Sequence, residues 1–230
     1  MILLQEKLKQ RNRVVVVSKK QVLCSPDPKW PRIDPSFLTM KQVSSDPKTG
    51  CKIFSFEKSP EYQSLQKEFA RVQATCDIQA LADFLRANFY HHESLIFIAD
   101  YLRLQGKFSD AAGFLERCLF AFEQAFSFDF QFVPASTSQE DKLNFRLQSR
   151  IDWEREPLNK VFAECLIKHI DLMGRKGCNR TGLEFCKLLL SLDPLQDPYG
   201  VLLRIDYYAI RAKEYKYLRK LIKQLPFEVH

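Results

Sequence analysis

The sequence predicts an all-α fold, a tetratricopeptide-like helical repeat preceded by a basic, proline-containing arm. Apolar residues recur with a period near 3.6 over most of residues 60–225, and the chain has only 7 glycines in 230 residues, which disfavours a fold rich in glycine turns. An internal repeat is also present. Leu115-Glu-Arg-Cys118 matches Leu183-Glu-Phe-Cys186 at an offset of 68, and Leu218 aligns with Leu183 at an offset of 35. Both offsets are close to multiples of the ~34 residues of a tetratricopeptide unit.

Residues 1–58 are expected to form a basic extended arm, and residues 59–230 the helical-repeat domain. The first 60 residues hold 12 basic and 5 acidic side chains, whereas the other residues hold 23 of each. Six of the 11 prolines also fall within these 60 residues, and proline interrupts helices. Two short runs in the arm, Val14–Val17 and Lys52–Phe56, are candidate strands.

The limits of the predicted helices follow from capping residues. Ser59-Pro60-Glu61 supplies an N-cap, a first-turn proline and an early acid, and Asp77 is placed to open the next helix. Gly106 is placed to end a third helix, in a tight turn between two helices. The later helices are expected over residues 93–105, 109–126, 157–174, 180–192, 198–212 and 214–225.

Between the fourth and fifth helices the apolar period changes to two. Phe126, Phe128, Phe130 and Phe132 alternate with polar residues, as do the apolar residues of 143–147 after a polar turn. This pattern predicts an inserted β-hairpin, or two extended strands, among the helices. Such a row of phenylalanines is more typical of a core than of a ligand site.

The sequence contains none of the common catalytic, phosphate-binding or metal-binding motifs. HExxH, GxSxG, GxGxxG and the P-loop pattern are missing, and the seven cysteines form no C-x₂-C pair. His91 and His92 precede a helix, so capping and surface solvation are expected of them. Asp193 and Asp197 are expected to cap helices rather than to act as acid and base. We therefore expect a protein without enzymatic activity, cofactor or metal.

Cysteine content and hydropathy indicate the compartment. An odd number of cysteines at irregular spacing argues against a disulfide framework and favours the cytosol or the nucleus. The first residues lack the order of charge and apolar run that a signal peptide shows. No apolar stretch approaches the ~18 residues of a membrane span, so a soluble protein without membrane contact is expected.

The basic residues of the arm are the candidate site. Six positive charges fall within fourteen positions, with only Glu6 nearby, and phosphate backbones attract such segments without sequence preference. Contact with rRNA or DNA is therefore one interpretation, and a solvated tail or a localisation signal is the other. The six residues are Lys7, Lys9, Arg11, Arg13, Lys19 and Lys20.

Several stretches, in order from about residue 25 to the end, match a known family. The longest is Arg175–Pro194, and the shorter ones are Trp30–Arg32, Phe54–Gln63, Tyr90–Leu95, Ile151–Arg155 and Leu203–Ala212. On these residues the sequence resembles the transcription factor 25 family (nuclear localised protein 1), whose fungal member is the first subunit of the ribosome quality control complex. Members of that family have a longer charged extension before the arm and further helices after Leu225-Pro-Phe227.

The resemblance implies a non-enzymatic adaptor that works in the cytoplasm on ribosomes and also enters the nucleus. Its implied partners are the 60S ribosomal subunit with a stalled nascent chain, the ubiquitin ligase listerin, and ubiquitin, and its implied role is to promote degradation of the stalled chain. The alternative is a nuclear transcriptional repressor that contacts DNA through the basic arm. The sequence shows no zinc finger, basic zipper or clear recognition helix, which disfavours specific base readout.

Overall fold

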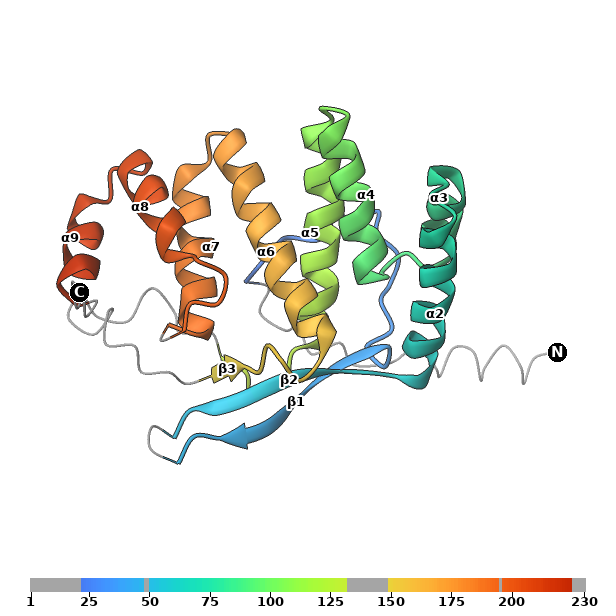
Figure 1. Cartoon of the computed structure of the whole chain (residues 1–230), viewed down its shortest axis with the longest axis horizontal. Helices are drawn as coiled ribbons and strands as arrows, with labels where there is room; N and C mark the ends of the chain where they lie inside the picture. The colour runs from blue at the N-terminus through green and yellow to red at the C-terminus, as the bar shows by residue number, and fades with distance from the viewer. Residues whose placement is uncertain (1–21, 48–49, 132–148, 195, 225–230) are drawn as a thin grey trace.

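The computed structural model describes residues 22–47, 50–131, 149–194 and 196–224. Within these residues the chain is mostly helical, as predicted, but a small sheet corrects the all-α class. Figure 1 shows the helices standing side by side in a row, with the sheet lying across one end of them. The elements in chain order are β1 (Leu38–Ser45), β2 (Lys52–Lys58), α2 (Pro60–Ala74), α3 (Ile78–Ala87), α4 (His92–Leu104), α5 (Phe108–Ala125), β3 (Ser149–Ile151), α6 (Pro157–Arg175), α7 (Asn179–Leu192), α8 (Leu202–Arg211) and α9 (Tyr215–Gln224).

The helices form four consecutive pairs, each joined by a tight turn. Helices that follow one another in the chain also contact one another, from α2·α3 to α8·α9. Each tight turn contains one residue with positive φ: Cys76 (54°), Gly106 (74°), Gly177 (76°) and Lys213 (59°). A left-handed residue after the last helical turn lets the chain reverse over a few residues. The predicted helix starts at Ser59 and Asp77 are confirmed, since each side chain accepts a hydrogen bond from a backbone N–H of the first turn.

The predicted repeat offset of 68 residues is wrong. It pairs Gly106 with Gly174, but Gly174 lies inside α6, and the turn glycine that corresponds to Gly106 is Gly177. Leu115 is the eighth residue of α5, whereas Leu183 is the fifth residue of α7, so the matching tetrapeptides occupy different helix positions. The two pairs α4–α5 and α6–α7 are neighbours, because α5 packs on α6. Residues 126–156 separate the two pairs in sequence.

The sheet includes part of the segment expected to be an extended arm. β1 and β2 form an antiparallel hairpin with an irregularity between Gln42 and Ser44, and β3 pairs with β2 in parallel. The predicted strand Lys52–Phe56 is confirmed, and the inner side chains Phe54 and Phe56 are buried in the main core. The strands β1 and β2 therefore pack against the helical body. The candidate strand Val14–Val17 lies outside the described residues.

The predicted strand over Phe126–Phe130 is wrong. The chain turns there, and the N–H of Phe130 donates to the carbonyl of Ser127 at 3.1 Å. The turn directs Phe126 and Phe130 into the core, against Phe56 and Phe54 respectively, while Phe128 is 90% exposed. The alternation thus reflects a turn that buries two rings, and the expected core role holds for those two. The rest of the predicted hairpin, residues 132–147, lies outside the described residues.

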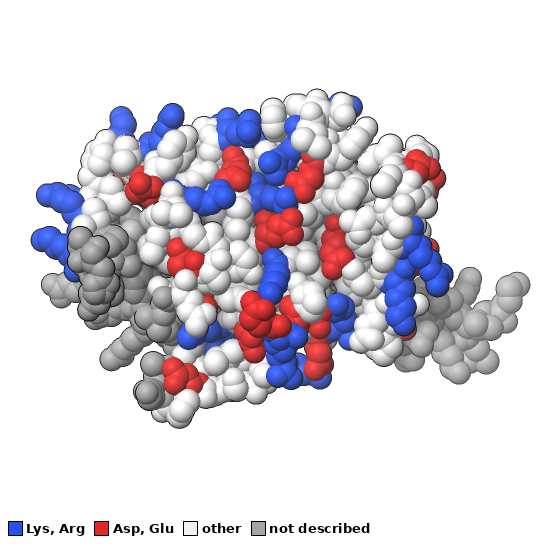
Figure 2. Space-filling model, viewed as in Figure 1, with Lys and Arg blue, Asp and Glu red and all other residues white. Residues whose placement is uncertain are grey.

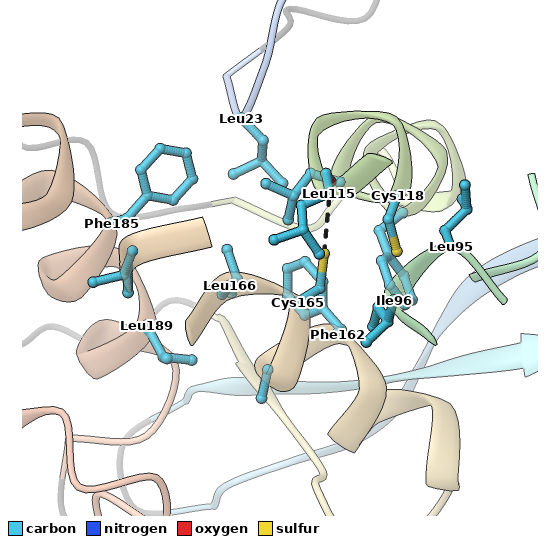
Figure 3. Packing of buried hydrophobic residues seen from close by; sticks show 14 of the residues in the cluster. Leu23, Leu95, Ile96, Leu115, Cys118, Phe162, Cys165, Leu166, Phe185 and Leu189 are labelled. Atoms are coloured by element: carbon cyan, nitrogen blue, oxygen red, sulfur yellow. Dashed lines mark hydrogen bonds between the residues drawn. The ribbon is translucent and has the colours of Figure 1, made fainter. Parts of the chain in front are cut away.

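The core runs through the row of helices. Figure 3 shows Leu115 and Cys118 of α5 facing Phe162, Cys165 and Leu166 of α6. The thiol of Cys165 donates to the carbonyl of Leu115 at 3.7 Å, the contact drawn as a dashed line. All seven cysteines are free thiols. Each helix buries one side against its neighbours, so the row shares a single core.

Candidate protein-interaction site

A mostly apolar pocket of about 260 Å³ lies at the sheet end of the first helices. One wall is the extended segment 31–38, and the others are the first turns of α2, the α3–α4 junction and the last turns of α5. The pocket therefore joins segments from four parts of the chain. Apolar pockets with a few polar groups are the usual places where proteins bind other molecules.

The wall segment is held on the α3–α4 junction and on α5 by contacts that are distant in sequence. The Tyr90 hydroxyl donates to the carbonyl of Pro31, and the ring of Trp30 lies 5.6 Å from that of Phe120. Upstream, the carboxylate of Glu123 accepts the N–H groups of Val22 and Leu23. Burial raises the pKa of Glu123, and those backbone hydrogen bonds partly oppose the rise. Two stretches that carry the family resemblance, Trp30–Arg32 and Tyr90–Leu95, thus meet at this wall.

The inner part of the pocket contains two histidines and a tyrosine. His91 caps α4, as predicted, because its Nδ1 accepts the N–H of Ser94 at 3.3 Å. The expected surface solvation is wrong, since His91 and His92 are both only 2% exposed. The ring of His91 stacks on Tyr62 at 5.3 Å, and the Tyr62 hydroxyl lies 3.0 Å from His92 Nδ1. The aromatic rings of α2 and α3 cover the start of α4 and exclude water from both imidazoles.

Burial keeps these groups uncharged. It lowers the pKa of His91 to about 4 and that of His92 to about 3, and it raises the pKa of Tyr62 well above its usual value. At neutral pH the pocket therefore presents neutral rings. Such a surface suits an apolar side chain of a protein partner better than an ion.

The buried histidines predict acid sensitivity. In the unfolded chain a histidine has a pKa of about 6.5. In the folded protein the pKa is about 4 for His91 and about 3 for His92. Between these limits the unfolded state binds more protons, so the free energy of unfolding falls as pH is lowered from about 6.5 towards 4. Each histidine contributes a slope of up to about 1.4 kcal/mol per pH unit.

His92→Gln should flatten this pH dependence. Denaturant unfolding at several pH values between 4 and 7 measures the slope directly. The wild-type chain should lose stability more steeply than the variant over this window, while the two should run parallel above pH 7. Equal slopes below pH 6.5 would contradict the burial of a neutral His92.

The other candidate residues are placed as follows. The six basic residues of the arm lie outside the described residues. Asp197 caps α8 as predicted, accepting the N–H groups of Val201 at 2.8 Å and Leu202 at 2.9 Å. Asp193 is the C-cap residue of α7, and its side chain does not cap a helix N-terminus. It is buried and forms an ion pair with Arg150, which joins β3 to the end of α7.

Cys24 and Cys186 are poorly suited to covalent chemistry, whereas Cys76 and Cys178 are exposed free thiols. Burial raises the pKa of Cys24 and Cys186 to about 12, so these thiols stay protonated and are poor nucleophiles. Within the described ranges there is no group of three or more His, Cys, Asp or Glu side chains that could hold a metal ion. Among those same residues, no helix is both long and apolar enough to cross a membrane.

Sequence reasoning missed the pocket. Its walls come from segments about ninety positions apart, between Pro31 and Ala125, and no local pattern reports their meeting. The available signal was the run Phe89-Tyr-His-His92, because four consecutive ring-bearing side chains at a helix start are unusual on a solvated surface.

The described residues therefore define a mostly helical protein with a mostly apolar pocket beside its small sheet. The model of the family described as "Transcriptional repressor TCF25" matches residues 54–229. The chain belongs to this family, which confirms the resemblance found in the sequence.

Similar proteins carry two kinds of name. "Ribosome quality control complex subunit TCF25" of Homo sapiens is 34% identical over 229 residues, which is 100% of this chain and 31% of the human protein. "Ribosome quality control complex subunit 1" of Schizosaccharomyces pombe is 29% identical over 200 residues, covering 87% of this chain and 28% of the relative. "Probable transcription factor claV" of Ampulloclitocybe clavipes is 29% identical over 161 residues, covering 70% of this chain and 19% of the relative.

The chain thus spans less than a third of the length of these relatives. No solved structure matches it significantly.

Proposed function

We propose that this chain acts as a non-enzymatic adaptor in ribosome quality control, promoting ubiquitin-dependent degradation of stalled nascent chains on 60S subunits. The observation that carries the proposal is family membership together with relatives from animals and fungi that are named as subunits of that complex. The pocket geometry supports it, because neutral buried rings suit binding and do not suit acid–base catalysis.

The proposed mechanism is positional. The adaptor would hold a listerin-type ubiquitin ligase, ubiquitin and the 60S-bound nascent chain in one arrangement, which raises their effective concentration without any chemical step of its own. The corresponding locations are the ribosome-associated cytoplasm and the nucleus. Contact with rRNA or DNA through the six basic residues of the arm is part of this proposal; they are Lys7, Lys9, Arg11, Arg13, Lys19 and Lys20.

We further propose that the helix pairs stack to form a tetratricopeptide-like superhelix. In such arrays each pair contacts only its neighbours, and the extended side of the array binds proteins. The consecutive packing of α2 to α9 supports this arrangement.

A bulky side chain at the pocket mouth tests the role of the pocket. Ala87 ends α3, lines the pocket and is exposed, so Ala87→Trp should fill the pocket without disturbing the core. Recovery of the ligase or of 60S proteins by affinity purification with crosslinking mass spectrometry should fall about tenfold, equivalent to about 1.4 kcal/mol.

Ala70→Trp is the matched control. Ala70 is an exposed alanine of α2 that does not line the pocket, so its substitution should leave partner recovery unchanged. Equal recovery with both variants would remove the pocket from the proposed function.

A transcriptional repressor is the second candidate. Two observations favour it: the description of the family model and the name of the relative from Ampulloclitocybe clavipes. In that case the protein should occupy chromatin, and its depletion should change transcription while turnover of stalled chains stays intact.

A further inference from the structure

Helix α9 carries a row of exposed basic side chains. They occur at spacings of three and four residues, so they share one side of the helix. Arg211 and Lys213 precede the helix and are exposed as well. Figure 2 shows blue side chains gathered at the end of the molecule where α8 and α9 lie. We call this row the α9 basic face; it consists of Lys216, Arg219, Lys220 and Lys223.

On several other helices, positive side chains are paired with negative ones. Lys168 of α6 lies 2.7 Å from Asp100 and 3.1 Å from Glu164, and Arg204 of α8 pairs with Asp171. On α9 no ion pair with another described residue is recorded for Lys216, Arg219 or Lys223. Like charges three and four positions apart repel one another and weaken a helix. The arrangement is therefore unfavourable for the folded chain alone and favourable with an anionic partner.

The opposite side of α9 is occupied. Leu221 is 2% exposed, and Tyr217 and Leu218 are partly buried against the core. The Lys187 ammonium of α7 lies 4.5 Å from the centre of the Tyr217 ring. Most of its apolar side is packed on the protein, although Ile222 of the same helix is 53% exposed, so α9 cannot place that whole side in a lipid surface. The exposed charges of Lys216, Arg219 and Lys223 are available for contact along a surface.

We propose that the α9 basic face binds the phosphate backbone of an RNA helix. From Lys216 to Lys223 the face spans roughly 10 Å at about 1.5 Å per residue. A duplex presents one phosphate per strand for about every 3.4 Å of axis, so roughly three phosphates lie opposite the face. RNA helices are recognised largely through shape and backbone, without base reading in their narrow major groove, which matches a helix that lies on a surface. The choice of RNA over DNA rests on the proposed ribosomal function.

Binding of the purified full chain to an RNA duplex of about 20 base pairs tests this proposal. Affinity is measured over a range of salt concentrations, and each variant is made both in the natural chain and in a chain whose six arm residues are changed to Gln. The second background separates the contribution of α9 to RNA binding from that of the arm. The test variant combines Lys216→Gln, Arg219→Gln and Lys223→Gln. The matched control combines Lys67→Gln, Arg71→Gln and Lys107→Gln, which removes three exposed charges that have no recorded ion pair within the described residues.

The test variant should reduce the slope of log affinity against log salt by up to about 0.9 for each lost phosphate contact, in both backgrounds. The control should keep the wild-type slope, and both variants should melt like the wild-type chain. An unchanged slope in the test variant would overturn the proposal. So would an equal change in the control, tighter binding to a DNA duplex, or equally tight binding to polyglutamate.

This outcome is independent of the adaptor proposal. RNA binding by purified protein can fail while the chain still sediments with 60S particles through protein contacts. Conversely, the α9 result can hold while the chain fails to join any ribosomal particle.

Discussion

We expect Asn159→Leu to lower the free energy of unfolding by about 4 kcal/mol. The substitution leaves buried backbone groups without hydrogen-bond partners, and each such group costs about 1–3 kcal/mol. Asn159 is completely buried in the first turn of α6. Its Oδ1 accepts the N–H of Phe56 at 3.0 Å, and its Nδ2 donates to Ser55 Oγ at 3.0 Å and to the carbonyl of Asp152. One amide thus joins β2, the segment after β3, and α6. Leucine has a similar volume, so the loss reports hydrogen bonds rather than a cavity.

Ser55→Ala is the graded control for this prediction. It removes one of the three Asn159 bonds and leaves the two backbone contacts, so a loss of about 1 kcal/mol is expected. Denaturant unfolding at neutral pH measures both variants. If Asn159→Leu were no worse than Ser55→Ala, the amide would not be the junction between sheet and helices.

Gly182→Ala should destabilise the chain by about 2–3 kcal/mol, the typical cost of overpacking a core. Tyr208 of α8 lies against both Gly182 of α7 and Gly174 of α6, and its hydroxyl donates to the carbonyl of Ile170 at 2.9 Å. A Cβ on Gly182 would come within 2.8 Å of Cδ1 and Cε1 of the Tyr208 ring. The ring is 5% exposed, so it cannot swing away freely. The third and fourth helix pairs would separate.

Gly113→Ala is the matched control, because Gly113 also lies inside a helix but a Cβ there meets nothing within 4 Å. That substitution should stabilise the chain by up to about 1 kcal/mol, the difference in helix propensity. In a Tyr208→Ala background, Gly182→Ala should lose its cost. Thermal melting of the wild-type chain, Gly182→Ala, Tyr208→Ala and the double variant tests the contact, with Gly113→Ala as the control. A similar cost of Gly182→Ala in both backgrounds would contradict the contact.

Helix limits could be predicted because they depend on neighbouring residues. Ser59 and Asp77 cap their helices through hydrogen bonds that span two or three positions, and such contacts are visible in the sequence. The repeat offset could not be predicted in the same way. A tetrapeptide match fixes no helix register, and with residues 126–156 between them the neighbouring pairs α4–α5 and α6–α7 are offset by about two repeat lengths in sequence.

The burial of His91 and His92 is a non-local property. Next to Glu93, at a helix start, they look like solvated capping residues, and one of them does cap the helix. Their exclusion from water depends on Tyr62 and Phe69 of α2 and on Phe84 of α3. The parallel pairing of β3 with β2 is equally non-local, since it joins residues 52–54 to residues 149–151.

The most direct test of the adaptor proposal is where the chain sediments in a cell lysate. Extracts with translation stalled on a reporter are separated on a sucrose gradient, and the chain is followed across soluble, 60S, 80S and chromatin fractions. The proposal predicts enrichment with 60S particles that carry the stalled nascent chain and its ubiquitin conjugates. Recovery with chromatin alone, and no increase in the 60S fraction on stalling, would contradict it.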